Sequence, residues 1–248
     1  MGLSARLTAG MVALIVLSVA ATGALTYHNV SIVEVPRGLD RLDSHARLLA
    51  SDLEASVRGS RSDALGIPTA AAVALEGVRR TTRAGGVDPF GSTTLAQWRG
   101  ELGGRFAAQL TASPDYDQIR LIGAADGGRE IARADRFGPG NTVRVVPEAE
   151  LQPRGDRDYF QRAMRLHGGE VDISAVELDR ERGAIDAPHV PLVRASTPVV
   201  GPDGRPFGIV VIDIDLRGPF AHARESALPG GRVYIVNTSG DYLAHPDP

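Results

Sequence analysis

The hydrophobic pattern changes twice along the chain. Residues 7–27 form an uninterrupted apolar run that contains no charged side chain. Between residues 39 and 110, apolar residues recur at intervals of three and four, which is the period of amphipathic helices. From residue 115 onward the period shortens to about two, which is typical of half-buried strands. The pattern therefore predicts a hydrophobic helix, then amphipathic helices, then a domain built largely on a sheet.

The apolar run is long enough to cross a membrane. A helix rises ~1.5 Å per residue, so residues 7–27 would cover the ~30 Å hydrocarbon core of a bilayer. Tyr27 stands at the end of the run, where an interfacial aromatic residue belongs. The alternative is a cleavable signal peptide, with the small residues at 20–24 as its cleavage region. We expect an uncleaved anchor, with the bulk of the chain outside the cytoplasm.

A seam of small and apolar residues follows Pro36 at heptad spacing. Its positions are Leu39, Leu42, Ala46, Leu49, Leu53 and Ser56. Two interpretations stay open: the helix packs on its own domain, or it pairs with its twin in a homodimer through residues 39–57. Further helices are expected at 69–83 and 95–110, separated by a loop rich in Gly and Pro at 84–92.

The strand-like segments outline an α+β fold. A hairpin at 115–135 turns at Asp-Gly-Gly, and a short extended piece follows at 143–146. A helix is expected to start at Asp156 as its N-cap and to end at 167. Further strands are predicted at 169–178, 190–200, 207–216 and from 232, the middle two joined by a Gly-Pro-Asp-Gly turn. This order predicts an antiparallel sheet of about five strands backed by helices, with a pocket on its other face.

Composition narrows the classes of function. The net charge of −3 gives no electrostatic reason to expect a nucleic-acid partner. The chain has no Cys, so thiolate catalysis and thiolate metal sites are excluded. Its 27 fixed side-chain cations are all Arg, which suits carboxylate recognition, although coding bias explains it as well. The histidines are scattered, and no P-loop, nucleophile elbow or dinucleotide fingerprint is present. No catalytic residue, metal or cofactor is therefore nominated.

Two carboxylates alternate with isoleucine on a predicted strand. Asp213 and Asp215 are interleaved with Ile212 and Ile214. Paired carboxylates can act as general acid and base. We interpret these two instead as the solvent-facing side of an amphipathic strand.

Several segments of the second half resemble one known family. The matching segments are YDQIRLI at 116–122, GREIARAD at 128–135, RDYFQRA at 157–163, GEVDISAVELDRERGAID at 169–186, PLVRASTPVV at 191–200, GRPFGIVVIDID at 204–215 and NTSGDYLAHPDP at 237–248. In this order they resemble the periplasmic double-Cache sensor domains of bacterial transmembrane receptors. Such receptors include sensor histidine kinases, diguanylate cyclases and chemoreceptors. The resemblance covers roughly half of the chain.

The resemblance implies a long helix followed by two stacked PAS-like lobes. The sequence shows no second span and no kinase or cyclase signature, so we expect it to be the N-terminal part of a longer receptor. The expected parts are a cytoplasmic tail at 1–6, a transmembrane helix at 7–27, a stalk with the helices of the sensor domain at 28–113, a membrane-distal Cache lobe at 114–218, and the truncated start of a membrane-proximal lobe at 219–248.

The resemblance also implies a ligand clamp. In amino-acid-binding members, an Arg followed by two aromatic residues at a helix start holds the ligand carboxylate. Arg157, Tyr159 and Phe160 resemble this motif, but Tyr and Phe stand where Trp and Tyr are usual, which puts an amino acid in doubt. A helix N-terminus and a guanidinium fork both favour a carboxylate. The alternative is that Arg157 pairs with a neighbouring Asp at the surface while both rings fill the core.

Polar residues on the predicted strands complete the candidate site. Arg120 and Arg194 each lie between apolar neighbours that face the other way. The acidic residues Glu177, Asp179 and Glu181 would meet a ligand amine or neutralise the arginines. The alternative for each residue is a solvated strand face. The full candidate set is Tyr116, Arg120, Arg157, Tyr159, Phe160, Ser174, Glu181 and Arg194.

The expected function follows from the anchor, the fold and the resemblance. We expect an extracytoplasmic sensing module in the bacterial inner membrane that binds a small anionic or zwitterionic molecule, carboxylate or amino-acid-like. The signal would pass through the membrane helix to a histidine kinase or diguanylate cyclase domain, so the segment itself is not an enzyme. A tethered scaffold without a small ligand is the main alternative. A periplasmic hydrolase is disfavoured because no nucleophile and base can be paired.

Overall fold

Two compact units, Met1–Asp52 and Leu53–Pro248, divide the chain. The computed structural model describes residues 2–125, 127–138, 140–178, 180–181, 184–185, 190–237, 240 and 242–244. The first unit is helical, and the second contains every strand of the described residues.

The first unit holds α1 (Leu3–Asn29), the π-helical turn η1 (Val30–Glu34) and the first part of α2 (Val35–Ala70). Pro36 follows η1 and has no amide hydrogen to continue the α-helical ladder, which accounts for the wider turn at this point. Within the described residues, one helix is long and apolar enough to cross a membrane, and its apolar part lies in α1. The predicted span at 7–27 therefore lies inside a helix.

Three helices of the second unit pack on one face of the sheet. They are the end of α2, α3 (Ala72–Arg83) and α4 (Leu95–Ala112). A capping box starts α4, because the Thr94 hydroxyl accepts from the amide of Gln97 while the Gln97 side chain accepts from the amide of Thr94. The helices predicted at 69–83 and 95–110 are confirmed to within a few residues, although α2 continues to Ala70.

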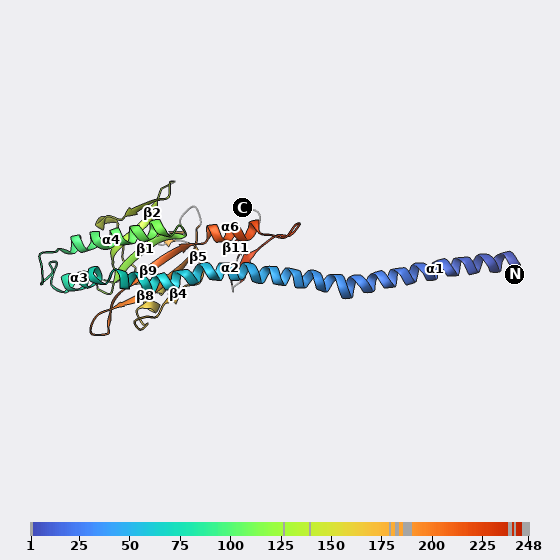
Figure 1. Ribbon diagram of the computed structural model, residues 1–248, viewed down its shortest axis with the longest axis horizontal. Helices are drawn as coiled ribbons and strands as arrows, with labels where there is room; N and C mark the ends of the chain where they lie inside the picture. Colours follow the sequence, from blue (N-terminus) through green and yellow to red (C-terminus); the bar gives the residue numbers. More distant parts are fainter. Residues whose placement is uncertain are drawn as a thin grey trace. The chain divides into compact units, whose positions relative to one another are not determined.

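The sheet is antiparallel throughout, with the order β3-β2-β1-β9-β8-β4 and with β5 also pairing with β8. Figure 1 shows β1, β9 and β8 as its centre. The predicted α+β class is thereby confirmed. The strands are β1 (Tyr116–Gly123), β2 (Glu130–Phe137), β3 (Thr142–Val145), β4 (Asp172–Ile173), β5 (Glu177–Leu178), β8 (Pro191–Val200) and β9 (Pro206–Asp215).

The strand predicted at 169–178 is interrupted in the middle. β4 and β5 are separate two-residue strands on the same edge of β8. Between them, the Ser174 hydroxyl accepts the amide hydrogen of Arg194 at 3.0 Å. A side-chain oxygen thus takes the place of the backbone carbonyl that a continuous ladder would supply.

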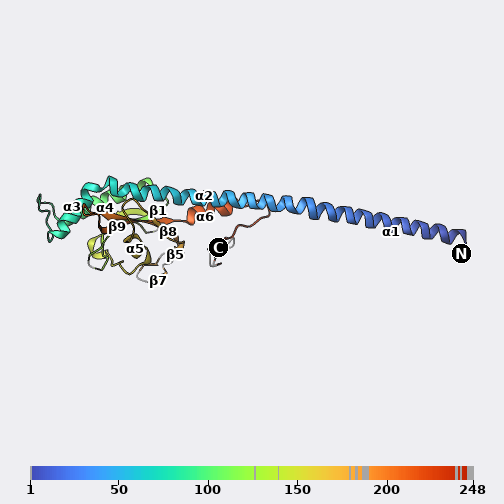
Figure 2. The ribbon, with the colours of Figure 1, turned by 90° about the horizontal axis from the view of Figure 1, so that it is seen from below.

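Each face of the sheet has its own apolar core. On the helical face, Ile119, Leu121 and Ile212 pack with α2, α3 and α4. On the other face, Tyr159, Phe160 and Ala163 of α5 (Asp158–Ala163) pack with Ile122, Ile209 and Val211. Figure 2 shows α4 and α5 on opposite sides of the strands. Both faces of the sheet are therefore covered.

The short helix α5 differs from the prediction at both ends. It starts at Asp158 with Arg157 as the N-cap residue, so Asp156 is not the N-cap. It ends at Ala163 rather than at 167, because the following residues form turns. The predicted helix was too long because the apolar spacing continues into this turn.

The chain ends in small elements, of which α6 (Arg217–Glu225) was not predicted. Leu216 is its N-cap residue, and the Asp215 side chain just before it accepts the amide hydrogen of Arg217 at 2.8 Å. The predicted lobe boundary near residue 218 stays a prediction. The remaining elements are η2 (Glu148–Glu150), the paired strands β6 (Arg180–Glu181) and β7 (Ala184–Ile185), and the paired strands β10 (Ile235–Val236) and β11 (Tyr242–Ala244).

Candidate ligand-binding site

A row of polar residues crosses the sheet on the face that α5 covers. The strand registers place Asp135 opposite both Arg144 and Gln118. They also place Asp213 opposite both Gln118 and Arg194. Directly opposed residues share a face, with Cβ atoms ~4.5–5.5 Å apart. The row therefore runs across five strands, with a carboxylate between polar or cationic neighbours on β2 and again on β9.

Arg120 of β1 lies in the next row and contacts a carboxylate on each of the two neighbouring strands. Its Nη1 donates to Glu130 Oε1 at 3.4 Å, and its Nη2 donates to Asp213 Oδ2. Arg133, directly opposite Arg120 on β2, donates to the other Glu130 oxygen at 3.3 Å. One carboxylate thus holds two adjacent guanidinium groups in place.

Arg154 reaches the same carboxylate from a loop. Its Nε lies 3.4 Å from Glu130 Oε1, and its amide donates to the Gly128 carbonyl at 2.8 Å. The loop approaches the β1–β2 turn so closely that a Cβ atom on Gly155 would lie 2.1 Å from the Gly127 carbonyl oxygen. The turn itself needs positive φ at Gly127 (69°) and Gly128 (75°). Glycine on both sides is therefore what brings Arg154 over the sheet.

These buried groups form what we name the arginine cluster. It consists of Arg120, Arg133, Arg154 and Arg194 with Glu130, Asp135 and Asp213, all nine-tenths buried or more. Burying a charge is costly unless it is paired. Among the described residues the cluster has four cations and three anions, and Glu177 at its edge adds one more carboxylate on Arg194. Its guanidinium groups are donors that suit an anion or the carboxylate end of a zwitterion.

Two further polar groups on this face are buried without a partner. Gln118 Oε1 and Ser196 Oγ have no hydrogen-bond partner among the described residues. Gln118 is opposite Asp213, and Ser196 is opposite Val211, next to that row. Buried polar atoms are usually hydrogen-bonded, so unsatisfied ones mark a surface suited to a polar guest.

Tyr159 of α5 covers the cluster. The Arg194 guanidinium lies 5.3 Å from the centre of its ring, in a cation–π contact. Burial raises the pKa of the Tyr159 hydroxyl, with the Asp213 charge acting in the same direction against nearby arginines. The hydroxyl therefore stays protonated at neutral pH and available as a donor.

The structure brings together five of the eight candidate residues. Arg120 and Arg194 belong to the arginine cluster, and Tyr159 and Phe160 pack over the same face. Ser174 adjoins it through the Arg194 amide. The register of β1, β9 and β8 puts the two arginines on one face, and the short helix α5 puts the two aromatic rings over it.

The other three candidates lie elsewhere or are not described. The Tyr116 side chain points to the helical face, where its hydroxyl donates to Asp63 Oδ2 at 2.7 Å. Arg157 is outside the cluster and partly exposed, at 29% of its side chain, with its Nε 4.0 Å from Asp156 Oδ1, so its role in a clamp stays a prediction. Glu181 lies in β6, but its side chain is outside the described residues, as is Asp179.

The interpretation of Asp213 as solvent-facing was wrong. Its side chain is fully buried and ion-paired with Arg120 and Arg194. A strand pattern shows which residues share a face but not whether that face is covered. Glu130 and Arg133 were missed for the same reason, since the alternation of Arg and Ala in β2 is also typical of a solvated edge. Arg154 was missed because it lies in a loop, where no periodic pattern marks a face.

The family comparison decides the class of protein. The family described as bacterial histidine kinase, sensor domain, matches residues 98–248. The chain belongs to this family. The sensor domain is not a catalytic domain, as was predicted. A comparison with curated proteins found no match.

Solved structures with the same fold are also sensory proteins. A methyl-accepting chemotaxis protein X is 17% identical, with a TM-score of 0.61, over 87% of this chain and 77% of that one. A domain assigned to the sensory box/GGDEF family from Vibrio parahaemolyticus is 18% identical, with a TM-score of 0.57, over 83% and 73%. The ligand-binding domain of the Pseudomonas aeruginosa PAO1 amino acid chemoreceptor PctC, solved with GABA, is 18% identical, with a TM-score of 0.51, over 84% and 75%. They support the predicted Cache-like fold.

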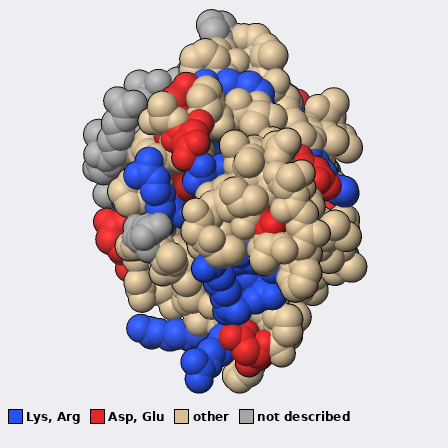
Figure 3. Space-filling model, turned by 90° about the vertical axis from the view of Figure 1, so that its left-hand side faces the viewer, with Lys and Arg blue, Asp and Glu red and all other residues tan. Residues whose placement is uncertain are grey.

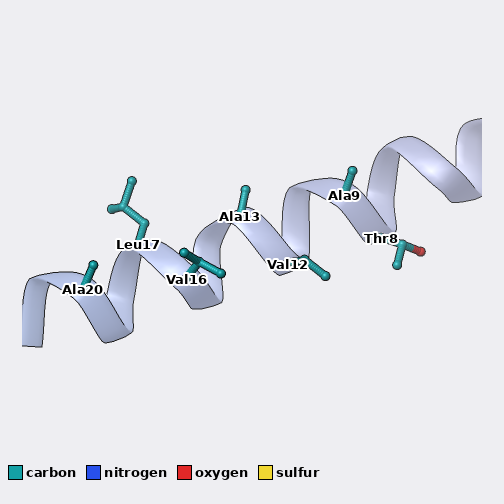
Figure 4. A pocket seen from close by; sticks show the side chains of 7 residues that line it. All are labelled: Thr8, Ala9, Val12, Ala13, Val16, Leu17 and Ala20. Atoms are coloured by element: carbon teal, nitrogen blue, oxygen red, sulfur yellow. The ribbon is translucent and has the colours of Figure 1, made fainter. Parts of the chain in front are cut away.

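Two hollows lie outside the arginine cluster. One runs along α1, and Figure 4 shows that all of its side chains project from that single helix, so it encloses nothing. The other, which we name the α2 groove, has a volume of about 640 Å³. It is lined by Leu53, Glu54, Val57, Arg58, Arg61, Ile173, Ser174, Ala175, Val176, Val193, Leu216, Phe220, Ile235, Val236, Asn237 and Leu243.

On the face in Figure 3, basic and acidic residues are interspersed rather than gathered into one large field of a single sign. Among the described residues, no group of three or more His, Asp or Glu side chains could hold a metal ion.

Proposed function

We propose that the sensor domain binds a small carboxylate-bearing molecule on the sheet face beneath α5. The observation that carries this proposal is the arginine cluster, in which four buried cations face three buried anions. A guanidinium fork is the side chain best matched to a carboxylate. Tyr159 adds a protonated hydroxyl and an aromatic wall at the same place.

The PctC domain supports a zwitterionic ligand. GABA, with which that domain was solved, carries a carboxylate and an amine. The cluster offers both kinds of partner, because Asp213 and Glu130 lie among the arginines. The proposed ligand class therefore stays the one predicted from the sequence, a small anion or zwitterion.

In the proposed receptor, the binding module would lie outside the cytoplasm of a bacterial cell. α1 would cross the inner membrane, and Leu39 and Leu42 are exposed on α2, where residues 39–57 would pair with a second copy. Ligand would shift the population between two arrangements of this helix, by no more than its differential affinity for them. The signal would reach a histidine kinase or diguanylate cyclase domain.

Ligand-induced stabilisation tests the proposal. The purified chain in detergent would be melted while Trp98 fluorescence is followed, with GABA, amino acids, small carboxylates, amines and purines. A ligand at 100 times its Kd adds ~2.7 kcal/mol to the free energy of unfolding, which is a shift of several degrees in Tm. We expect carboxylates to stabilise and simple amines not to.

Two variants locate the site. Arg194→Lys keeps a positive charge but removes the fork, so it is expected to lose the shift. Arg157→Ala tests the clamp predicted by the resemblance: loss of the shift in a folded variant would support the clamp, and a retained shift would leave recognition to the arginine cluster. Arg105→Ala is the matched control, because Arg105 pairs with Glu101 on the exposed side of α4. Equal shifts in all four proteins would contradict a site beneath α5.

A further inference from the structure

Glu177 contacts the arginine cluster from outside. Its Oε2 lies 2.9 Å from Arg194 Nη1, whereas Asp213 Oδ1 lies 3.5 Å from Arg194 Nε. The Arg194 side chain is 7% exposed, but the Glu177 side chain is 52% exposed. Glu130 and Asp213, by contrast, are fully buried. Glu177 therefore differs from the carboxylates that belong to the sheet face.

Glu177 also adds a carboxylate to the charges described around the cluster. The cluster has four arginines and three carboxylates among the described residues, and Glu177 supplies a fourth anion. The neighbouring pair of Arg144 and Glu150 adds one charge of each sign and leaves the balance unchanged. Of the two carboxylates described on Arg194, Glu177 is thus the one that reaches solvent, and Asp213 is fully buried.

Little of the sheet holds Glu177 in place. β5 pairs with β8 only through Glu177 and Leu178, and one of their two partners is Pro191, which has no amide hydrogen to donate. Before it, residues 174–176 form no strand. Moving Glu177 away from Arg194 therefore disrupts few backbone hydrogen bonds.

We propose that Glu177 occupies the ligand's own carboxylate position on Arg194, as an internal competitor that a ligand carboxylate displaces. This rests on the proposed function, since it assigns one subsite of that site. The exchange conserves charge, because one carboxylate replaces another on the same guanidinium. The ligand class that it selects is a small carboxylate with no second anionic group near Arg194.

The segment that precedes Glu177 lines the same groove as α2, so displacement of Glu177 would act next to α2. Ser174, Ala175 and Val176 directly precede Glu177 and line the α2 groove, as do Leu53 and Val57 of α2. Ser174 is tied to Arg194 in both directions, through its amide to the Arg194 carbonyl and through its hydroxyl to the Arg194 amide. A ligand that releases Glu177 therefore frees the end of a segment that borders both the cluster and α2.

Acetate is a direct probe of the exchange. The purified chain in detergent would be melted in increasing sodium acetate, with sodium chloride keeping the ionic strength equal, and an apparent acetate Kd would be taken from the Tm shift. Glu177→Gln keeps the shape of the side chain and removes its charge. Because a hydrogen bond to a charged group is lost from the competitor, the acetate Kd is expected to fall about tenfold.

Controls separate this inference from the proposed function. Glu148→Gln removes an exposed carboxylate from Arg99 elsewhere on the domain and should leave the acetate Kd unchanged. Arg194→Lys in the Glu177→Gln background should restore weak binding. An acetate Kd equal in wild type and Glu177→Gln, but weakened by Arg194→Lys, overturns the inference and leaves the carboxylate site standing. No acetate-specific shift in either protein overturns both.

Discussion

Arg120 and Asp213 form an ion pair between neighbouring strands in the centre of the sheet, with side-chain exposures of 3% and 0%. Each also has a second charged partner, Glu130 for Arg120 and Arg194 for Asp213. A buried pair of this kind gives little net stability, because the desolvation cost offsets the attraction. Stability alone therefore does not explain its presence on a covered face, and we propose that it serves ligand recognition.

Variants of this pair are expected to change the free energy of unfolding and the ligand-induced Tm shift independently. Asp213→Asn should cost ~3–5 kcal/mol of unfolding free energy, because it leaves Arg120 and Arg194 with too little negative charge. The double variant Arg120→Met, Asp213→Leu should regain most of that loss and still give no ligand-induced Tm shift. Urea unfolding and the ligand melt measure the two effects. A double variant that still responded to ligand would show that the pair serves packing alone.

Replacing Tyr116 is expected to lower stability without affecting ligand binding. Its hydroxyl joins β1 to Asp63 of α2 on the helical face, and burial, followed by the bond to Asp63, raises its pKa. Tyr116→Phe should cost roughly 1–2 kcal/mol in urea unfolding, because Asp63 loses a donor. The ligand-induced shift should persist, since the residue faces away from the cluster. Loss of binding in a folded Tyr116→Phe protein would contradict the assignment of faces.

A side chain at position 155 is expected to move Arg154 away from the sheet. A Cβ atom there would overlap the Gly127 carbonyl, so Gly155→Ala should push the loop off the β1–β2 turn and cost ~1–3 kcal/mol. Gly104→Ala is the control, because its Cβ would meet nothing within 4 Å on helix α4. That control should be stabilised by ~0.5–1 kcal/mol. Similar stability of both variants would argue against close contact at the turn.

Asp88 predicts how stability depends on pH. Hydrogen bonds from Arg80, at 2.7 Å and 3.2 Å, and from the Phe90 amide lower its pKa below the usual value. A carboxyl whose pKa is lower in the folded state stabilises fully above its unfolded pKa of ~3.9 and loses that stabilisation as the pH falls through the folded pKa. The Tm deficit of Asp88→Asn should therefore be largest near neutral pH and shrink below about pH 4. A deficit that stayed constant down to pH 3 would count against the ion pair.

The sequence was sufficient for the strands and the two main hairpins because their signals are local. The alternation around Arg120 and Arg194 put both arginines on one face, and the Gly-Pro-Asp-Gly turn joined β8 to β9. The covering of that face was not predictable in the same way. It depends on α5, only six residues long, and on the contact of Gly155 with Gly127 across the fold. The burial of Asp213 depends on tertiary contacts, which the sequence of its own strand does not encode.

Hydrogen–deuterium exchange with a stabilising carboxylate tests the central claim most directly, because it shows where a ligand acts. We expect the ligand to slow exchange in α5, in the 151–157 loop and in the β1–β2 turn, which surround the arginine cluster. Residues 174–178 should exchange faster if Glu177 is released. Protection confined to the walls of the α2 groove, with α5 unchanged, would contradict a ligand site beneath α5.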